Sequence, residues 1–194
     1  MSESRQTLRP EYFDALYTAD PDPWKFAASP YERDKYTLTL NAMPKPRYRS
    51  ALEVGCSIGV LTRSLASRCD TLIAIDAAQT PLLEARRRCA DLPGVRFEHM
   101  FVPDQWPDGV FGLILLSEVV YYLSRDDVGR LAAKVINSLP KGGSVILVHW
   151  TGLTNYPLSG DEAADLFIER IGPTCVVERA DRYAEFRLDV LSRA

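Results

Sequence analysis

The sequence predicts an α/β protein built on a doubly wound, largely parallel sheet, and three observations lead to this prediction. From residue 50 onward, short β-rich runs alternate with helical runs, which is the pattern of βαβ units. The runs TLIAI, GLILL and SVILV are almost continuously apolar, as expected for strands that helices cover on both faces. A glycine-rich segment, EVGCSIG, joins the first of these strands to the first helix, at the kind of position where open α/β sheets bind ligands.

Length and composition indicate one globular domain. The chain has 194 residues, which is enough for one domain with a full hydrophobic core and too few for two ordinary enzyme domains. Hydrophobic residues make up 46% and charged residues 25%, a balance typical of soluble globular proteins. We therefore expect a single domain over residues 1–194, with a helical cap at 1–49 and an α/β core at 50–194.

Charge and cysteine usage argue against several classes of partner. The formal net charge is −3, and affinity for nucleic acid depends on Lys and Arg that neutralise phosphates, so we expect no nucleic-acid partner. The four cysteines form no CxxC pair and only two histidines accompany them, so we expect no metal site. The N-terminus lacks the apolar core of a signal peptide and no apolar run could cross a bilayer, so we expect a cytoplasmic protein without a membrane partner. The sequence makes no prediction of the oligomeric state.

The predicted elements follow one another in a regular order. The segment before residue 50 carries prolines, aromatic residues and two helical stretches without strand periodicity, which predicts an appended helical cap. The core strands are predicted at Ala51–Val54, Thr71–Ile75, Val95–His99, Phe111–Leu116 and Ser144–His149. The intervening helices are predicted at Val60–Arg68, Gln79–Ala90 and Arg125–Ser138, the last of them preceded by Ser124 as a cap and followed by Gly142-Gly143.

The C-terminal segment is expected to close the sheet. A further helix is predicted at Asp161–Ile171, and CVVERADRYAEFRLDVLSR after it predicts two strands joined near Asp181-Arg182. Strands joined by such a short connection run antiparallel. The complete fold is thus expected to be a seven-stranded sheet with a C-terminal antiparallel hairpin.

The segment ALEVGCSIGVLTRSLA carries the functional inference, because a strand ends in Glu53, turns through glycines and enters a helix. Gly55 and Gly59 permit tight turns and close ligand approach, and a helix N-terminus attracts polar or negative ligand groups. A dinucleotide fingerprint starting at Gly55 needs glycines where the sequence has Ser57 and Val60. The phosphate loop GxxxxGK[ST] fails as well, since no Lys-Ser or Lys-Thr pair follows.

The segment EVGCSIG resembles the first motif of class I S-adenosylmethionine-dependent methyltransferases, which share a Rossmann-like fold, although Ser57 replaces a glycine of the usual pattern. The resemblance implies S-adenosylmethionine as the cofactor. It also implies that the motif residues hold the methionine part of that cofactor: Glu53, Gly55, Cys56, Ser57 and Gly59.

Further cofactor residues are expected at the ends of the later strands. Asp76 lies 23 positions beyond Glu53 (76 − 53), about where a carboxylate binds the ribose hydroxyls in Rossmann-like folds, although it could instead cap the following helix. The resemblance places the cofactor next to other residues as well: Ala77, Met100, Phe101 and Ser117.

The segments DPWKFAASPYERDKYTLTL and EVVYYL together resemble the branch of NodS-type nodulation N-methyltransferases. This resemblance implies a small-molecule or saccharide acceptor, methylated at nitrogen, with oxygen as the alternative. It also implies that the cap closes over the cofactor through Trp24, Tyr31 and Lys35, with Lys35 paired to the cofactor carboxylate or simply exposed on the surface.

Two residues at the ends of neighbouring strands are candidates for the chemistry. Glu118 could hold the amino group of the cofactor, orient an acceptor amine, or merely begin a helix. His149 could act as a base or be a core histidine beside Trp150. Tyr121 and Tyr122 could stack on the acceptor or belong to the core.

The sequence patterns are compatible with two other functions. A catalytically silent module that binds S-adenosylmethionine would tolerate the altered residues Ser57 and Phe101. A nicotinamide-dependent oxidoreductase would share the sheet and Asp76 but lacks the glycine fingerprint.

Overall fold

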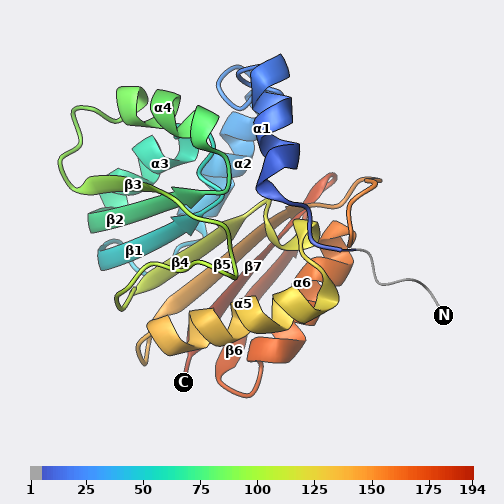
Figure 1. Ribbon diagram of the computed structural model, residues 1–194. Coiled ribbons are helices and arrows are strands. Elements are labelled where there is room, and N and C mark those ends of the chain that lie inside the picture. The colour runs from blue at the N-terminus through green and yellow to red at the C-terminus, as the bar shows by residue number, and fades with distance from the viewer. Residues whose placement is uncertain (1–5) are drawn as a thin grey trace.

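The structure, a computed structural model, describes residues 6–194 and contains one seven-stranded sheet in the order β3-β2-β1-β4-β5-β7-β6 (Figure 1). Strands β1 to β5 pair in parallel, whereas β7 lies antiparallel between β5 and β6. The strands are β1 (Tyr48–Val54), β2 (Cys69–Asp76), β3 (Val95–His99), β4 (Leu113–Ser117), β5 (Ser144–Trp150), β6 (Cys175–Arg182) and β7 (Phe186–Arg193). This is the expected doubly wound sheet with a C-terminal antiparallel hairpin.

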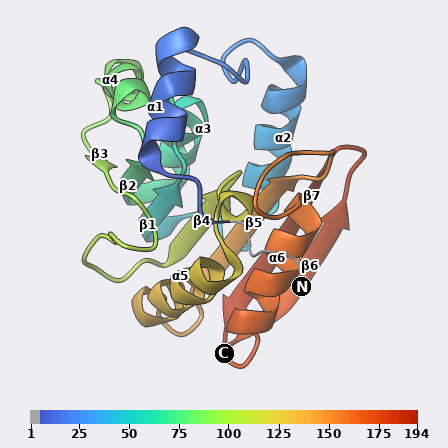
Figure 2. The ribbon, with the colours of Figure 1, turned by 45° about the vertical axis from the view of Figure 1, so that its right-hand side comes forward.

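Within the described residues, six α-helices surround the sheet, and two of them precede it in the chain. They are α1 (Pro10–Ala19), α2 (Pro30–Asn41), α3 (Val60–Leu65), α4 (Gln79–Arg88), α5 (Arg125–Ser138) and α6 (Gly160–Ile171). Figure 2 shows α1 and α2 above the same edge of the sheet but apart from each other, with α3 between them in this view and α5 and α6 on a different side. None of the helices in residues 6–194 has the length and apolar character that a membrane span requires.

Local signals explain where the helices begin. Pro10 and Pro30 occupy the first helical position of α1 and α2, where the missing N–H of proline costs nothing. The Ser124 side chain accepts a hydrogen bond from the backbone N–H of Asp127, as expected for an N-cap. Ser159 and Glu162 form a capping box at the start of α6.

The hydrophobic core lies on both faces of the sheet, since alternate strand residues point in opposite directions. Leu52 and Leu116 pack with α5 and α6 on one face, while Leu72 and Leu115 pack with Leu65 of α3 on the other. All five of these leucines are at most 1% exposed. The apolar runs in the sequence are therefore central strands covered on both sides.

The strand order reverses between β2-β1 and β4-β5, which creates a crevice at the carboxyl ends of β1 and β4. Val54 at the end of β1 pairs with Leu116, the residue before Ser117 at the end of β4. Ile75 of β2 pairs with the same Val54. The ends of these three strands consequently meet at the glycine-rich turn.

Some predicted boundaries differ from the structure. The predicted helix Val60–Arg68 is an α-helix only to Leu65 and continues as a 3-10 turn, Ala66–Arg68. The hairpin turn, predicted near Asp181-Arg182, lies at residues 183–185, because β6 keeps its pairing with β7 through Arg182. Strand β1 begins at Tyr48, inside the predicted cap, and the first five residues of that cap lie outside the described residues.

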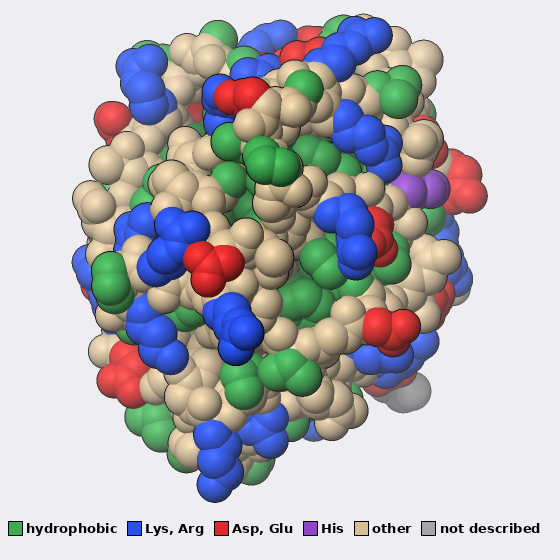
Figure 3. Space-filling view, turned by 90° about the vertical axis from the view of Figure 1, so that its left-hand side faces the viewer, with side chains coloured by type: hydrophobic (Ala, Val, Ile, Leu, Met, Phe, Trp, Pro, Cys, Tyr) green, Lys and Arg blue, Asp and Glu red, His purple; other side chains and the backbone are tan. Residues whose placement is uncertain are grey.

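Helix α4 ends in three consecutive arginines, Arg86 to Arg88, and two of them bind backbone carbonyls of neighbouring segments. Arg86 donates to the Phe97 carbonyl at 2.9 Å, and Arg88 donates to the Ile58 carbonyl at 2.9 Å. In Figure 3, Lys and Arg side chains are spread over the visible face in separate groups, with acidic side chains between them. The run therefore connects α4 to neighbouring segments.

Candidate functional site

A cavity of about 470 Å³ lies at the carboxyl ends of β1, β2 and β4, beneath the cap. This volume is within the range of small-molecule sites. Ten of its 28 lining residues are aromatic and nine more carry nonpolar aliphatic side chains, so its walls are mostly apolar with a few polar groups between them. The cavity is therefore suited to a ligand with flat or apolar parts and a small number of charged atoms.

The glycine-rich turn forms one wall of this cavity. Gly55 has φ +83°, and a Cβ added to it would lie 2.3 Å from Cγ2 of Val119, so only glycine fits. Its N–H donates to the Ile75 carbonyl at 2.9 Å, which ties the turn to β2. Gly59, at φ +76°, does not line the cavity, because it packs against Ala85 of α4. Its role is close helix packing.

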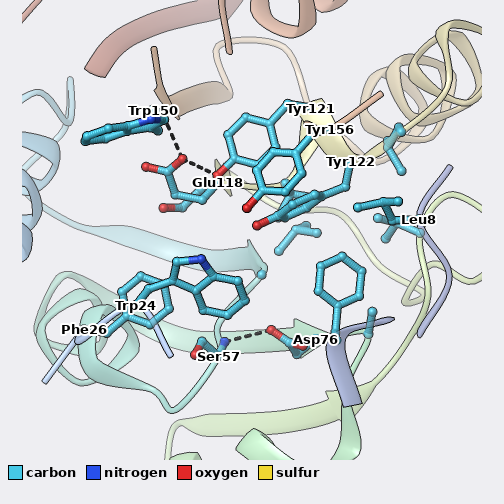
Figure 4. A pocket seen from close by; sticks show the side chains of 18 of the residues that line it. Leu8, Trp24, Phe26, Ser57, Asp76, Glu118, Tyr121, Tyr122, Trp150 and Tyr156 are labelled. Atoms are coloured by element: carbon cyan, nitrogen blue, oxygen red, sulfur yellow. Dashed lines mark hydrogen bonds between the residues drawn. The ribbon is translucent and has the colours of Figure 1, made fainter. Parts of the chain in front are cut away.

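Asp76 holds the turn and also faces the cavity. One carboxylate oxygen accepts the N–H of Ser57 at 2.8 Å and the other accepts the N–H of Ala78 at 2.9 Å (Figure 4). The N-cap of α4 is Ala78, and no side chain caps that helix, so the capping alternative for Asp76 is wrong. Burial raises the pKa of Asp76, although both backbone N–H groups oppose that rise.

Glu53 and Cys56 lie behind the turn. Both line a small side pocket of about 30 Å³ that shares Gly55, Ser57 and Ser117 with the rim of the main cavity. Burial raises the pKa of Glu53 to about 7. Within residues 6–194, Oε2 of Glu53 has no hydrogen-bond partner. An orphaned buried carboxylate oxygen is costly, and it fits a polar group supplied by a ligand.

Glu118 stands at the opposite wall, one residue after β4, with φ +56°. Its Oε2 accepts the hydroxyl of Tyr121 at 2.6 Å and the backbone N–H of Trp150 at 2.8 Å. Its Oε1 accepts the ammonium of Lys35 at 2.7 Å. Burial acts to raise the pKa of Glu118, but the charge of Lys35 and these hydrogen bonds hold it below its usual value. Glu118 is therefore an ionised acceptor and a weak base.

Helix α2 presents a polar face to the interior. Its fully buried residues are Glu32, Lys35 and Thr39, whereas a purely structural helix would bury apolar side chains there. The Lys35 side chain is 3% exposed and its Nζ lies 2.9 Å from Oε1 of Glu32. Burial acts to lower the pKa of Lys35, but the Glu118 and Glu32 carboxylates raise it. The alternative that Lys35 is a surface residue is therefore wrong.

Aromatic residues of the cap close the cavity over the turn. Trp24 and Phe26 stack with ring centroids 5.6 Å apart, and Tyr17 packs edge-on against Trp24. The Tyr17 hydroxyl hydrogen-bonds Oγ of Ser57, which joins the cap to the turn. Tyr31 lies edge-on to Trp150 across the cavity, 5.8 Å between centroids. Tyr17, Phe26 and Glu32 were missed as site residues, because only tertiary contacts bring them there.

The other predicted cofactor residues reach the same cavity. Ala77, Met100, Phe101 and Ser117 all line it, beside Asp76. The backbone of Met100 is held there by donating its N–H to the Asp76 carbonyl at 3.0 Å. The region after β3 thus lies next to the end of β2, as the resemblance implies.

His149 is not brought to the cavity. It is fully buried, and its Nε2 accepts the backbone N–H of Val120 at 3.2 Å. Burial lowers its pKa to about 4, so the ring is neutral. A ring that does not line the cavity cannot take a proton from an acceptor there, so the structure favours the core alternative. In the described part of the chain, no three His, Cys, Asp or Glu side chains are grouped to hold a metal ion.

Comparison with known proteins identifies several similar sequences and folds. A family model described as Nodulation protein S (NodS) matches residues 6–146. Nodulation protein S of Rhizobium tropici is 30% identical over 130 residues, covering 66% of this chain and 55% of the relative. The chain thus spans about half the length of the curated nodulation proteins it matches.

Solved structures show the same fold over most of the chain. A crystal structure from Pseudomonas syringae, described as a candidate methyltransferase, is 36% identical, with 84% of this chain and 99% of that chain covered and a TM-score of 0.73. The N-methyltransferase NodS of Bradyrhizobium japonicum WM9, in complex with S-adenosyl-l-homocysteine, is 18% identical, with 96% and 99% covered and a TM-score of 0.78. The latter likeness concerns the fold alone.

Proposed function

Because the chain belongs to the nodulation protein S (NodS) family, we propose that it is an S-adenosylmethionine-dependent methyltransferase that acts on the nitrogen of a small-molecule or saccharide acceptor. The observation that carries this proposal is the pair of carboxylates around the glycine-rich turn. Asp76 faces the cavity while it holds Ser57, and Glu53 keeps an orphaned oxygen behind the turn. These groups fit the hydroxyls and the amino group of the cofactor.

Each part of the cofactor has residues of suitable chemistry near it in this proposal. Asp76 accepts the ribose hydroxyls, and Lys35, which donates to two carboxylates and has a third N–H, binds the cofactor carboxylate. The amino group lies at the Ser117 segment, and Glu53 faces it from the side pocket that shares Ser117 with the cavity. Adenine rests on the side chains next to Asp76, which are those of Ala77, Met100 and Phe101. The rings of Trp24 and Tyr31 in the cap exclude water from above.

The cofactor, when bound, supplies a methyl carbon on a sulfonium: its carbon–sulfur bond breaks as the nitrogen–carbon bond forms, the electron pair stays on sulfur, and the methylated ammonium releases one proton. The protein must therefore align the acceptor and keep water away. An amine that arrives neutral needs no strong base, whereas a hydroxyl acceptor does.

The state of Glu118 favours nitrogen over oxygen. Its lowered pKa makes it a poor base for an alcohol, and no histidine is among the described residues that line the cavity. Its ionised Oε1 accepts only Lys35 among the described residues and has room for a second donor, so it can accept the N–H of an amine. In this role Glu118 directs the nitrogen lone pair toward the methyl group.

Transfer of labelled methyl from S-adenosylmethionine to a panel of amines and alcohols tests the proposal. We expect label in amines. Glu118→Gln should lower kcat at least tenfold while the affinity for S-adenosylhomocysteine stays within twofold. The matched control is Glu169→Gln, an exposed carboxylate on α6, which should behave as the wild type. Cofactor binding without label in any acceptor would favour the silent binding module, and label in alcohols alone would reject nitrogen as the acceptor atom.

A further inference from the structure

The cavity has a second half, opposite the glycine-rich turn, which we call the tyrosine chamber and define by Leu8, Tyr121, Tyr122, Trp150 and Tyr156. Figure 4 shows these side chains together on one side of the cavity, while Ser57, Asp76 and Trp24 lie on the other. Since the proposed cofactor residues occupy the turn side, the tyrosine chamber is the space that is left for the acceptor.

The walls of the tyrosine chamber are ring faces and ring edges. Tyr121 and Tyr156 stack at 5.2 Å between centroids with 25° between their planes. Tyr122 meets Tyr156 edge-on at 4.7 Å, and Phe13 meets Tyr122 edge-on at 4.8 Å. Rings that touch at these distances leave no gap between them, so they form one continuous, rigid apolar wall against which a flat apolar group can pack.

The phenol hydroxyls of the tyrosine chamber already have partners within the protein. Tyr121 donates to Oε2 of Glu118. Tyr156 is hydrogen-bonded to Tyr122 and to Tyr12. A ligand rich in hydroxyl groups would have to bury them where the protein's own hydrogen bonds occupy the walls, and each unpaired hydroxyl would weaken binding.

Glu118 supplies a carboxylate at the border of the tyrosine chamber, paired with the ammonium of Lys35. The charged residues lining the whole cavity are Glu32, Lys35, Asp76 and Glu118, three carboxylates against one ammonium. This excess of negative charge, together with ring faces, favours an amine and disfavours an acceptor that carries phosphate or carboxylate.

Part of the tyrosine chamber comes from a segment outside the family match. Trp150 and Tyr156 follow residue 146, where the match to the NodS family model ends. The same segment carries Leu153, which lines the cavity and is fully exposed, so the rim continues the apolar surface outward. Two of the five residues that define the tyrosine chamber thus lie beyond the family match, whereas Leu8, Tyr121 and Tyr122 lie within it.

From these observations we infer that the acceptor is a primary or secondary amine on a flat apolar scaffold, of the arylalkylamine type, and is not a hydroxyl-rich aminosugar. This inference rests on the proposed function, because it needs the cofactor on the side of the turn. The amine lies against Oε1 of Glu118 and its scaffold packs on the wall that Tyr121, Tyr122 and Tyr156 present to the cavity.

The test compares two probes in protein saturated with S-adenosylhomocysteine. Isothermal titration should give a dissociation constant at least tenfold lower for 2-phenylethylamine than for glucosamine. Turnover with labelled S-adenosylmethionine should show at least a tenfold higher kcat/KM for 2-phenylethylamine. Equal or better binding and turnover of glucosamine would overturn the inference and leave the proposed function intact.

Two variants of Tyr156 separate ring contact from hydrogen bonding. Tyr156→Ala should weaken 2-phenylethylamine binding at least tenfold, and Tyr156→Phe, which keeps the ring, should stay within threefold of the wild type. The control Leu83→Ala removes an exposed apolar side chain from α4 and should change neither probe. Unchanged amine binding in Tyr156→Ala would overturn the inference. If the wild-type protein does not bind S-adenosylhomocysteine, the proposed function is wrong, and the inference that rests on it is wrong as well.

Discussion

Replacing Lys35 by methionine should destabilise the protein strongly, because it removes the only cation from a buried group of three charges. Nζ of Lys35 lies 2.7 Å from Oε1 of Glu118 and 2.9 Å from Oε1 of Glu32. The three side chains are 3%, 14% and 9% exposed, for Lys35, Glu118 and Glu32 respectively. Methionine keeps the volume of the lysine stem, so the change is mainly one of charge.

The expected loss in free energy of unfolding follows from the carboxylates that remain without a cation. Removing one partner of a buried ion pair costs about 3–5 kcal/mol, since it leaves an uncompensated charge. For a chain of this size that corresponds to a fall in Tm of roughly 6 to 20 °C. The pKa values of Glu118 and Glu32 rise once the ammonium is gone, so both protonate more easily. The loss in free energy of unfolding caused by Lys35→Met should therefore be smaller at pH 5 than at pH 8.

Urea denaturation followed by far-ultraviolet circular dichroism measures this effect at both pH values. The double variant Lys35→Met, Glu118→Gln should recover part of the loss, because it removes one of the stranded carboxylates. The matched control is Lys25→Met, whose Nζ also lies 2.7 Å from a carboxylate, Asp20, but whose side chain is 63% exposed. It should leave stability almost unchanged. If Lys35→Met is as stable as Lys25→Met at pH 8, the buried charge of Lys35 does not stabilise the fold as expected.

Three further predictions concern the turn and its carboxylates. Gly55→Ala should weaken S-adenosylhomocysteine binding at least tenfold and lower Tm in a thermal melt, because the new Cβ would lie 2.3 Å from Val119 at a residue with φ +83°. An unchanged dissociation constant and Tm would contradict the requirement for glycine at this position. Burial raises the pKa of Glu53 from 4.5 to about 7. The contribution of the Glu53 carboxyl to the free energy of unfolding is therefore fully present below pH 4.5 and lost as pH rises through 7. Wild-type stability relative to Glu53→Gln should then fall by about 3 kcal/mol over that range in urea titrations, and parallel pH curves would contradict this. Asp76→Asn should raise the dissociation constant for S-adenosylhomocysteine at least tenfold by calorimetry, and an unchanged constant would remove Asp76 from the ribose site.

The fold could be predicted from sequence because its signals are local. The central strands read as apolar runs, and β3 and α5 agree with their predicted bounds, Val95–His99 and Arg125–Ser138. The errors arise where tertiary contacts set the boundary. Pairing with β7 extends β6 through Arg182, past the predicted turn.

The sequence indicates that residues of the glycine-rich turn meet at the cavity for a similar reason. Gly55, Ser57 and Asp76 lie at the ends of predicted strands, and the sheet brings such ends together. His149 also lies near a strand end, but that position does not reveal which way a side chain points, and its ring packs against Tyr121 instead. Tyr17 and Glu32 come from the cap, whose position over the sheet no local pattern encodes.

Isothermal titration of the wild-type protein with S-adenosylhomocysteine measures whether the cavity at the glycine-rich turn binds the cofactor product. We expect one binding site per chain and a dissociation constant of roughly micromolar order, which corresponds to a binding free energy of about −8 kcal/mol. Absence of binding heat at millimolar ligand, with the protein folded by circular dichroism, would contradict it.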